Sequence, residues 1–277
     1  MRSWALITGG SVRLGREIGL AFARAGWNVA CHYNRSDAGA HALCAELRGL
    51  GVDALAVQGD LEDEASCQSI FDTTVAITGT ALQCVVNNAS LFVPDEGANF
   101  DEAQALAQIK VNLMAPMRFG KWMAALHEAS APSGDKTVAA SPDTAPALAS
   151  AKPSVIHVLD QKVFNLNPDY FSYTLSKLAL ERAVSLQAQS LAPTLRVNAV
   201  APGLMYLSGP QTQDNFNRAA SANLLRQPIN PADVASSVVF LAGNASITGT
   251  TVRVDNGQHL VPLARDVMFV VEELFKS

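Results

Sequence analysis

The sequence predicts an α/β fold in which a parallel, doubly wound sheet carries helices on both faces. Two observations predict it. Short apolar runs alternate with segments of helical spacing along the 277 residues, and a glycine-rich turn joins the first run to the first helical segment. Apolar residues make up 49% of the chain and charged residues 16%, which is enough apolar surface for a large core. We therefore expect a single domain over residues 1–277.

The expected strands are the apolar runs, and they lie at residues 4–8, 28–33, 52–58, 82–87, 155–160, 195–200 and 251–254. Between them apolar residues recur at helical spacing, as at Leu14, Ile18 and Phe22, where Gly26 follows as a helix stop. Ser36 is a plausible N-cap for the second helix. The expected helices lie at residues 13–25, 36–50, 62–78, 101–128, 171–192 and 231–241.

One stretch breaks the alternation. Residues 129–153 are rich in Ala, Ser and Pro and show little periodicity, so we expect a long, flexible surface insertion there. A lid or a contact with a partner protein is the alternative for this insertion.

Charge, hydropathy and cysteine usage argue against several classes of protein. The net charge is −5 and the pI is near 5.5, so we expect no general binding of nucleic acid. No apolar run reaches the ~18 residues of a membrane span, and the apolar start is too short for a signal peptide. The cysteines and histidines lack metal-ligand spacing, which favours reduced thiols in a cytoplasmic protein and predicts no metal site.

The glycine-rich turn is the first candidate for a ligand site. Residues 8–15 read T-G-G-S-V-R-L-G and lie between the first strand and the first helix. Glycines let the backbone approach a pyrophosphate, and the helix N-terminus offers unpaired N–H groups. Gly9, Arg13, Leu14 and Gly15 are therefore candidate cofactor-binding residues, with a plain structural turn as the alternative.

The end of the second strand indicates which dinucleotide binds. An acidic residue there would bond the 2′-hydroxyl of NAD, but this chain has Asn34, Arg35 and Ser36. A guanidinium binds phosphate through two parallel hydrogen bonds, so Arg35, together with Arg13, favours NADPH. Asp37 lies past the strand end, where an aspartate stabilises the helix dipole.

Tyr173 and Lys177 lie four residues apart on an expected helix and therefore share one face. The usual tyrosine pKa of about 10 hinders proton exchange at neutral pH, and a nearby ammonium lowers it. We expect Lys177 to lower the pKa of Tyr173 in this way, so that the pair can act as a general acid in a reduction. The Y-x-x-x-K spacing alone also occurs by chance.

Taken in order, these features resemble the short-chain dehydrogenase/reductase family from about residue 3 to about residue 260: T-G-x-x-x-R-x-G, Asn87-Asn88-Ala89, Asn112, Tyr173 with Lys177, and Pro202-Gly203. The resemblance implies a Rossmann fold with a seven-stranded parallel sheet, hydride transfer with a nicotinamide cofactor, and a homotetramer. It implies that Asn88, Ala89, Pro202 and Gly203 lie along the cofactor, that Tyr173 donates the proton, that Lys177 holds the nicotinamide ribose, and that Asn112 supports a water-linked proton relay to Lys177.

Two departures from the common family pattern are informative. Arg13 stands where most members carry a third glycine, and Asp160, 13 residues before Tyr173, stands where most carry a serine. Both departures, with N-A-S-L-F at residues 88–92, resemble the pteridine reductase branch. The dihydromonapterin reductases of bacteria are similar and also use the aspartate. In that branch an aromatic ring, here Phe92, and the nicotinamide sandwich the flat pterin.

The chemistry of pterin reduction fits the aspartate. Hydride delivery to a ring C=N bond must be matched by protonation of the ring nitrogen, and Asp160 bonded to Tyr173 would supply a carboxyl–phenol relay. A serine carries no titratable proton near neutral pH. A solvated loop residue is the alternative reading for Asp160.

Further substrate contacts are expected around that relay. Phe92 would supply a stacking face, Arg13 would reach both the pyrophosphate and the pterin, and Ser90 would bond substrate or cofactor phosphate. The alternatives are a packing residue for Phe92 and a turn cap for Ser90. Asp60 and Leu61 resemble the family's adenine contact, with a helix N-cap as the alternative for Asp60.

Two later segments complete the expected substrate side. Pro202-Gly203 opens a substrate loop over residues 203–228, which we expect to act as a mobile lid with Leu204 as an apolar wall. Residues 262–277 extend past the usual end of the family, and they carry apolar side chains at Val267, Phe269, Val270 and Leu274. We expect this stripe to pack against a neighbouring subunit, with a frayed tail as the alternative.

Three functions compete at this point. The first is an NADPH-dependent reductase of a dihydropterin, which rests on Arg13, Asp160 and Phe92. The second is an NADPH-dependent ketone reductase such as a 3-oxoacyl-thioester reductase, against which the missing serine at 160 counts. The third is a non-catalytic NADPH-binding regulator, against which Tyr173 and Lys177 count. All three predict a small-molecule ligand and no nucleic acid or membrane partner.

Overall fold

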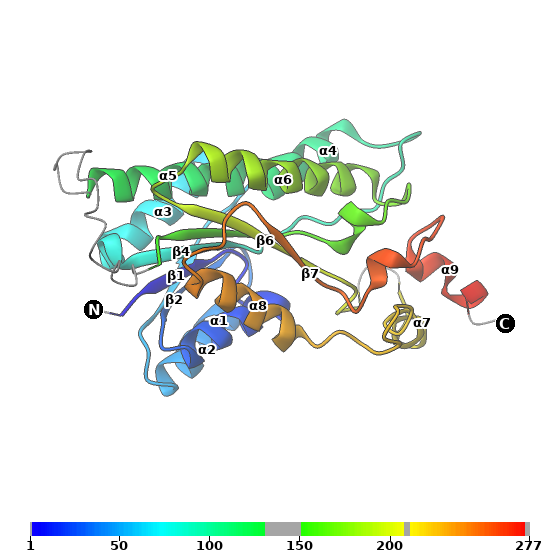
Figure 1. The fold of residues 1–277 in the computed structure, drawn as a ribbon, viewed down its shortest axis with the longest axis horizontal. Helices are drawn as coiled ribbons and strands as arrows, with labels where there is room; N and C mark the ends of the chain where they lie inside the picture. The colour runs from blue at the N-terminus through cyan, green and yellow to red at the C-terminus, as the bar shows by residue number, and fades with distance from the viewer. Residues whose placement is uncertain (1, 131–150, 208–210, 275–277) are drawn as a thin grey trace, which may run out of the picture.

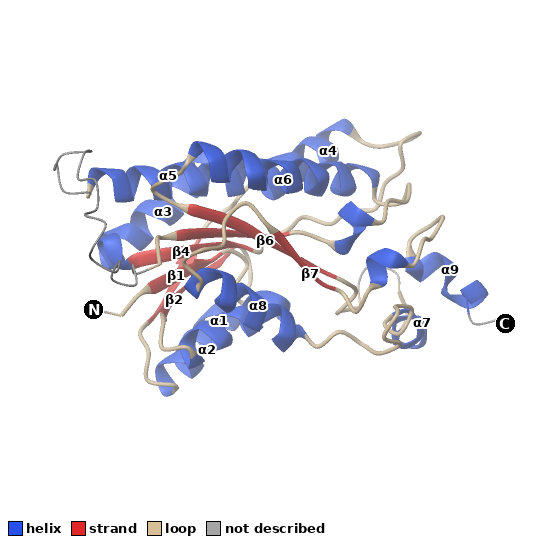
Figure 2. Cartoon of the chain, in the orientation of Figure 1, coloured by secondary structure: helices blue, strands red, loops and turns tan. Residues whose placement is uncertain are grey.

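The computed structural model describes residues 2–130, 151–207 and 211–274 and places its seven strands in one parallel sheet (Figures 1 and 2). The strands are β1 (Trp4–Ile7), β2 (Asn28–Tyr33), β3 (Ala54–Gln58), β4 (Leu82–Asn87), β5 (Ser154–Val158), β6 (Arg196–Pro202) and β7 (Thr251–Val254). Their order is β3-β2-β1-β4-β5-β6-β7, so the winding reverses between β1 and β4. Ligands of such sheets bind beyond the carboxyl ends of the strands at that reversal. The predicted fold class is confirmed.

Helices cover both faces of the sheet (Figure 1). One face carries α1 (Arg13–Arg24), α2 (Asp37–Gly49) and α8 (Pro231–Gly243), and the other carries α3 (Glu64–Thr78), α4 (Glu102–Ile109), α5 (Ala115–Ala129) and α6 (Phe171–Ser190). The expected helices agree with these bounds within a few residues, apart from the segment 101–128.

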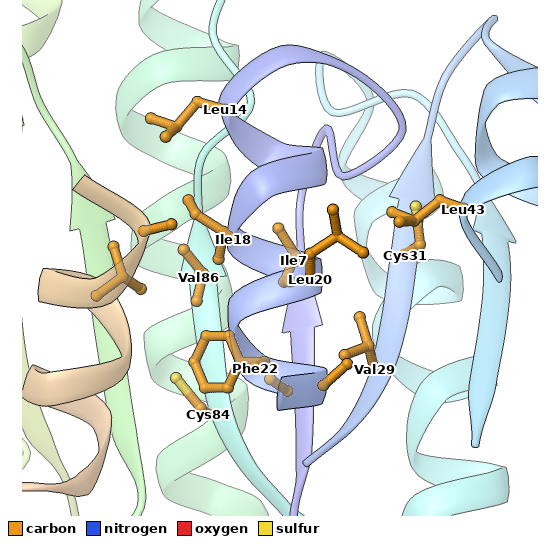
Figure 3. Packing of buried hydrophobic residues seen from close by; sticks show 14 of the residues in the cluster. Ile7, Leu14, Ile18, Leu20, Phe22, Val29, Cys31, Leu43, Cys84 and Val86 are labelled. Carbon is orange, nitrogen blue, oxygen red and sulfur yellow. The ribbon is translucent and has the colours of Figure 1, made fainter. Parts of the chain in front are cut away.

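The core lies between the sheet and each helical layer. Figure 3 shows Ile18 and Phe22 of α1 beside Val86 and Cys84 of β4, and all four are fully buried. Burying a phenylalanine of this kind contributes roughly 1.5–3 kcal/mol. All four cysteines are buried and free, and burial raises the pKa of the Cys84 thiol to about 12. They therefore behave as small apolar core residues.

The single helix expected over residues 101–128 is interrupted. Its middle is a π-helical turn, η2 (Lys110–Met114), between α4 and α5. Asn112 lies in this turn with 1% of its surface exposed. Such turns inside α-helices often mark functional sites.

The C-terminal extension folds onto its own chain. Helix α7 (Gln213–Ala219) lies within the substrate loop, and α9 (Val267–Leu274) packs against it beyond the carboxyl edge of the sheet (Figure 1). Val267 and Val271 form a buried cluster with Ala219 and Ala222. The prediction that Val267 faces a neighbouring subunit is therefore wrong, because α7 already covers it. Phe269 stays 47% exposed.

Some sequence expectations lie outside the described residues, namely most of the insertion at 129–153, residues 208–210 of the substrate loop and residues 275–277 of the C-terminal extension. In the described part of the chain, no helix combines the length and hydropathy needed to span a bilayer. Across the same ranges, no three or more His, Cys, Asp or Glu side chains gather in a way that could hold a metal ion.

Candidate active site

The glycine-rich turn closes tightly at the reversal point of the sheet. Gly9 has φ of +61° and Arg13 has φ of +49°, so Arg13 adopts the backbone geometry that favours glycine. A Cβ on Gly15 would lie 2.1 Å from the Gly9 carbonyl oxygen, so no other residue fits there. Helix α1 begins at Arg13, within this turn, and a helix N-terminus offers unpaired N–H groups to a phosphate.

The turn is tied to the end of β4 by Thr8. Its hydroxyl accepts hydrogen bonds from the N–H groups of Asn88 and Ala89, both at 3.0 Å. In return the Asn88 side chain donates to the carbonyls of Thr8 at 2.9 Å and Gly9 at 3.1 Å. The two predicted cofactor-binding segments therefore form one hydrogen-bonded unit.

His32 holds the same turn from β2, a role that the sequence reasoning missed. The Gly9 N–H donates to Nδ1 of His32 at 3.1 Å, and Nε2 donates to the Gly59 carbonyl at 3.1 Å. Burial lowers the pKa of His32 to about 4, so the ring is neutral near pH 7. A histidine facing the core from a strand carries no local signal for this role.

The residues expected around the adenosine half lie at the ends of β2 and β3. Asn34, Arg35 and Ser36 are exposed there. Asp60 accepts from the Glu62 N–H at 2.9 Å, whereas the N-cap of α3 is Asp63. The N-cap alternative for Asp60 is therefore wrong. Leu61 is buried in the core at 5% exposure.

Asp160 and Tyr173 form a direct pair at the carboxyl end of β5. The Tyr173 hydroxyl donates to Oδ2 of Asp160 at 2.9 Å, and Oδ1 accepts from the Lys162 N–H at 2.8 Å. Asp160 caps the short 3-10 helix η3 (Gln161–Phe164), which fixes its direction. Burial raises the pKa of Asp160, while the bonds from Lys162 and Tyr173 oppose that shift. The alternative of a solvated loop residue does not hold.

Tyr173 is held as a neutral phenol, contrary to the expectation from Lys177. Burial, followed by the Asp160 charge, raises the pKa of Tyr173 well above its usual value. The Lys177 ammonium instead donates to the Val158 carbonyl at 2.8 Å and lies 5.8 Å from the centre of the Tyr173 ring. Burial lowers the pKa of Lys177 to about 8. The predicted lowering of the Tyr173 pKa is wrong because Asp160, rather than Lys177, is its polar partner.

Asn112 fixes the segment after β4. Its side-chain oxygen accepts from the Leu91 N–H at 2.8 Å and the Ser90 hydroxyl at 3.2 Å, and its amide nitrogen donates to the Leu91 carbonyl at 2.9 Å and the Ser176 hydroxyl at 3.0 Å. These bonds use the full capacity of the side chain. Asn112 therefore positions Ser90 and Leu91, and the water-linked relay from Asn112 to Lys177 stays a prediction.

Phe92 packs against two tyrosines of the site, as one of the two alternatives predicts, and its stacking on a ligand stays a prediction. Its ring stacks on Tyr170 with ring centres 4.1 Å apart, and it lies nearly perpendicular to the Tyr173 ring with centres 4.6 Å apart. It nevertheless keeps 36% of its surface exposed. Tyr170 has φ of +55°, which is rare for a bulky residue and typical of functional sites. Sequence reasoning missed Tyr170, because nothing local marks a strained tyrosine.

One cavity of about 300 Å³ extends from the glycine-rich turn to the Asp160–Tyr173 pair. Of the predicted site residues it gathers Arg13, Leu14, Asn88, Ser90, Phe92, Asp160, Tyr173, Lys177, Pro202, Gly203 and Leu204. The predicted residues that do not line it are Gly9, Gly15, Asn34, Arg35, Ser36, Asp60, Leu61, Ala89 and Asn112. Wall residues that the prediction missed include Lys162, Tyr206, Gln258, Asp266 and Met268.

This arrangement of turn, paired tyrosine and lysine, and parallel sheet defines an oxidoreductase of the short chain dehydrogenase family, and the chain belongs to it. Residues 3–134 match that family under the description short chain dehydrogenase, and residues 137–259 match the related family Enoyl-(Acyl carrier protein) reductase.

Known proteins similar to this chain come from more than one branch. The solved structure of FolM alternative dihydrofolate reductase 1 from Brucella canis, complexed with NADP, is 33% identical with a TM-score of 0.80, covering 93% of this chain and 94% of that one. Pteridine reductase 1 of Leishmania tarentolae is 28% identical, covering 92% and 96%. The 3-oxoacyl-[acyl-carrier-protein] reductase FabG of Staphylococcus aureus is 26% identical, covering 94% and 99%.

Proposed function

We infer that the protein is an NADPH-dependent reductase that converts a dihydropterin into a tetrahydropterin. The observation that carries this proposal is the 2.9 Å hydrogen bond between Tyr173 and Asp160 beside the exposed part of the Phe92 ring. A carboxyl–phenol pair can protonate a ring nitrogen, and an aromatic face can stack on a flat heterocycle. The similarity to FolM and to pteridine reductase 1 supports the same class of substrate.

The cofactor fits the residues present. The structure of the Brucella canis relative contains NADP, and the Gly9–Gly15 turn has the close backbone approach that a pyrophosphate needs. Arg35, exposed at the end of β2, would bind the 2′-phosphate, and Asn34 and Ser36 would flank it. Asp60 and Leu61 would lie near the adenine, with Gly9, Arg13, Leu14 and Gly15 at the pyrophosphate. Asn88, Ala89, Ser90, Pro202 and Gly203 would line the nicotinamide half.

In this mechanism the chain supplies the proton. NADPH, when bound, supplies the hydride to a ring carbon of the substrate. Tyr173, kept as a phenol by burial and by Asp160, gives its proton to the adjacent ring nitrogen. The Asp160 carboxylate, whose pKa is raised by burial, would take up a proton from water in the cavity and pass it to the Tyr173 oxygen, which restores the phenol. The C=N bond thereby becomes CH–NH.

The other predicted residues orient the reactants. Lys177, anchored on Val158, would hold the nicotinamide ribose. Asn112 would keep Ser90 in place against substrate or cofactor through its 3.2 Å bond. Arg13 lines the cavity and donates to the Leu207 carbonyl at 3.3 Å, so it can reach both the pyrophosphate and the pterin. Leu204 would form an apolar wall of the cavity that Phe92 also lines.

A second candidate is a 3-oxoacyl-thioester reductase, which the 26% identity to FabG favours. NADPH oxidation at 340 nm with dihydrobiopterin, dihydromonapterin and an acetoacetyl thioester, measured side by side, separates the two. We expect turnover of the pterins. Selective turnover of the thioester would support the second candidate, and no turnover of any of them would favour a regulator.

We also infer a homotetramer, as the family resemblance implies. Helices α4 and α6 lie side by side and expose Leu106, Leu175 and Leu186. Exposed leucines along paired helices are typical of subunit interfaces. Light scattering coupled to size exclusion gives the mass in solution, and a monomeric mass would contradict this inference.

A further inference from the structure

Two ion pairs fasten the C-terminal segment, residues 265–271, to the rest of the chain, and the first of them lies in the active-site cavity. Nζ of Lys162 lies 3.2 Å from Oδ2 of Asp266, and the Arg265 guanidinium bonds Asp169 through Nε at 2.8 Å and 2.9 Å. The partners in each pair are about a hundred positions apart in the chain. The C-terminal segment is therefore held by specific charges and not only by apolar packing.

Lys162 is an unusual lysine because only 3% of its surface is exposed. Buried lysines require a partner, since an unpaired ammonium in the interior is costly. Its ammonium has Asp266 on one side and lies 5.2 Å from the centre of the Tyr170 ring on another. Lys162 is also the residue whose backbone N–H holds Oδ1 of Asp160.

Asp266 links the start of α9 to this lysine. Oδ1 accepts from the Met268 N–H at 3.2 Å and Oδ2 faces Lys162, while its own N–H donates to Asp169 at 2.6 Å. Met268 in turn accepts a hydrogen bond at Sδ from the Tyr170 hydroxyl at 3.4 Å. Tyr170 stacks on Phe92. The C-terminal segment therefore contacts Lys162, which holds Asp160, and Tyr170, which packs against Phe92.

The two charges act on Asp160 in opposite directions. Asp160 and Asp266 line the same cavity, and the Asp266 charge raises the pKa of Asp160 while the Lys162 charge lowers it. Tyr173 and Lys177 of α6 also interact with Asp160. Arg13 and Tyr206 line the cavity from the glycine turn and the substrate loop.

We propose that Lys162 and Asp266 are positioning residues that fasten the C-terminal segment against the Asp160–Tyr173 pair and balance the charge on it. Lys162 and Asp266 give Asp160 one positive and one negative neighbour, so the Asp160 carboxyl can both hold and release a proton. The expected change in the pH dependence of turnover rests on the proposed function, whereas the expected change in the pKa of Asp160 does not.

The test is a carboxyl ¹³C NMR titration of the full-length protein labelled on aspartate, with the Asp160 signal assigned by its loss in Asp160→Asn. We expect Lys162→Met to raise the pKa of Asp160 and Asp266→Asn to lower it. The double variant should titrate near the wild type, because both charges are gone. Asp266→Asn keeps the side-chain oxygen that caps α9 and so remains informative even if Lys162→Met fails to fold.

The matched control is Arg265→Gln, which loosens the same segment without removing a charge that acts on Asp160. It should leave the Asp160 titration unchanged. Shifts of the two single variants in the same direction, no shift in either, or an equal shift in Arg265→Gln would overturn the proposal and indicate a purely structural pair.

Turnover separates this proposal from the proposed function. With a dihydropterin as substrate, the pH at which kcat falls on the alkaline side should move upward in Lys162→Met and downward in Asp266→Asn. If the wild type turns over no pterin, the proposed function fails, and the NMR titration still decides whether the pair balances Asp160.

Discussion

The nucleotide side of the molecule, built on β1 to β4, and the cap formed by α7 and the C-terminal segment are assembled in different ways. On the nucleotide side, Thr8, Gly9, His32 and Asn88 meet because parallel strands bring their ends to one edge. In the cap, Lys162 meets Asp266 and Tyr170 meets Met268 across about a hundred residues. On the nucleotide side, side chains bond backbone groups that the order of the parallel strands brings together. In the cap, side chains bond one another.

This difference explains which parts of the fold and site could be predicted. Strand and helix periodicity predicted the sheet, and the spacing of Gly9, Arg13 and Gly15 predicted the turn, because both are local patterns. Asp160 and Tyr173 were also paired correctly, since the end of a strand and the next helix meet in this fold.

The parts that could not be predicted depend on contacts distant in sequence. Nothing near Lys162 indicates that it is buried, and nothing near Val267 indicates that α7 covers it. The π turn at Asn112 was missed because its residues keep ordinary helical periodicity. The direction of the Tyr173 pKa shift was wrong because the spacing to Lys177 shows a shared face but not which group the ammonium contacts.

The largest expected effect is on kcat and comes from the Asp160–Tyr173 pair, which lies in the cavity between the two regions. Tyr173→Phe removes the proton donor and should lower kcat for a dihydropterin by about 10²–10⁴-fold. Tyr170→Phe is the matched control, because it keeps the ring that stacks on Phe92 and loses only the bond to Met268. Steady-state NADPH oxidation measures both. Equal losses in the two variants would mean that the phenol of Tyr173 is not the donor.

On the nucleotide side, Arg35→Gln should raise the KM for NADPH by about 10–100-fold, since a charged hydrogen bond contributes about 1.5–3 kcal/mol. The kcat at saturating NADPH should stay close to the wild-type value, because Arg35 lies outside the cavity. Arg24→Gln, an exposed arginine at the other end of α1, is the control. An unchanged KM for NADPH in Arg35→Gln would argue that another group binds the 2′-phosphate.

The buried histidines predict an acid limit to stability. His32 and His157, each neutral with a pKa lowered to about 4 by burial, bind protons more readily in the unfolded chain. Their contribution is complete above the unfolded pKa of about 6.5 and is lost as the pH falls toward 4. Urea unfolding should show a loss of about 2 kcal/mol per histidine between pH 7 and pH 4.5. His32→Gln should reduce this dependence, whereas His41→Gln, on the surface, should not.

The smallest expected effect tests the cap itself. Val271 is fully buried against α7, whereas Phe269 is 47% exposed. Phe269→Ser should change the free energy of unfolding by less than about 0.5 kcal/mol, as surface substitutions usually do. Val271→Ala should cost more and should raise the KM for substrate. A larger loss of stability in Phe269→Ser than in Val271→Ala would contradict the docking of α9 on its own chain.

The most direct measurement is turnover of dihydrobiopterin by Asp160→Ser, compared with the wild type across pH 5 to 9. Asp160 is proposed to return the proton to Tyr173, so the variant should lose about 10²-fold or more in kcat at neutral pH. Its KM for NADPH should be unchanged. If Asp160→Ser turned over the pterin as fast as the wild type does, that result would contradict the carboxyl–phenol relay even if the substrate class is correct.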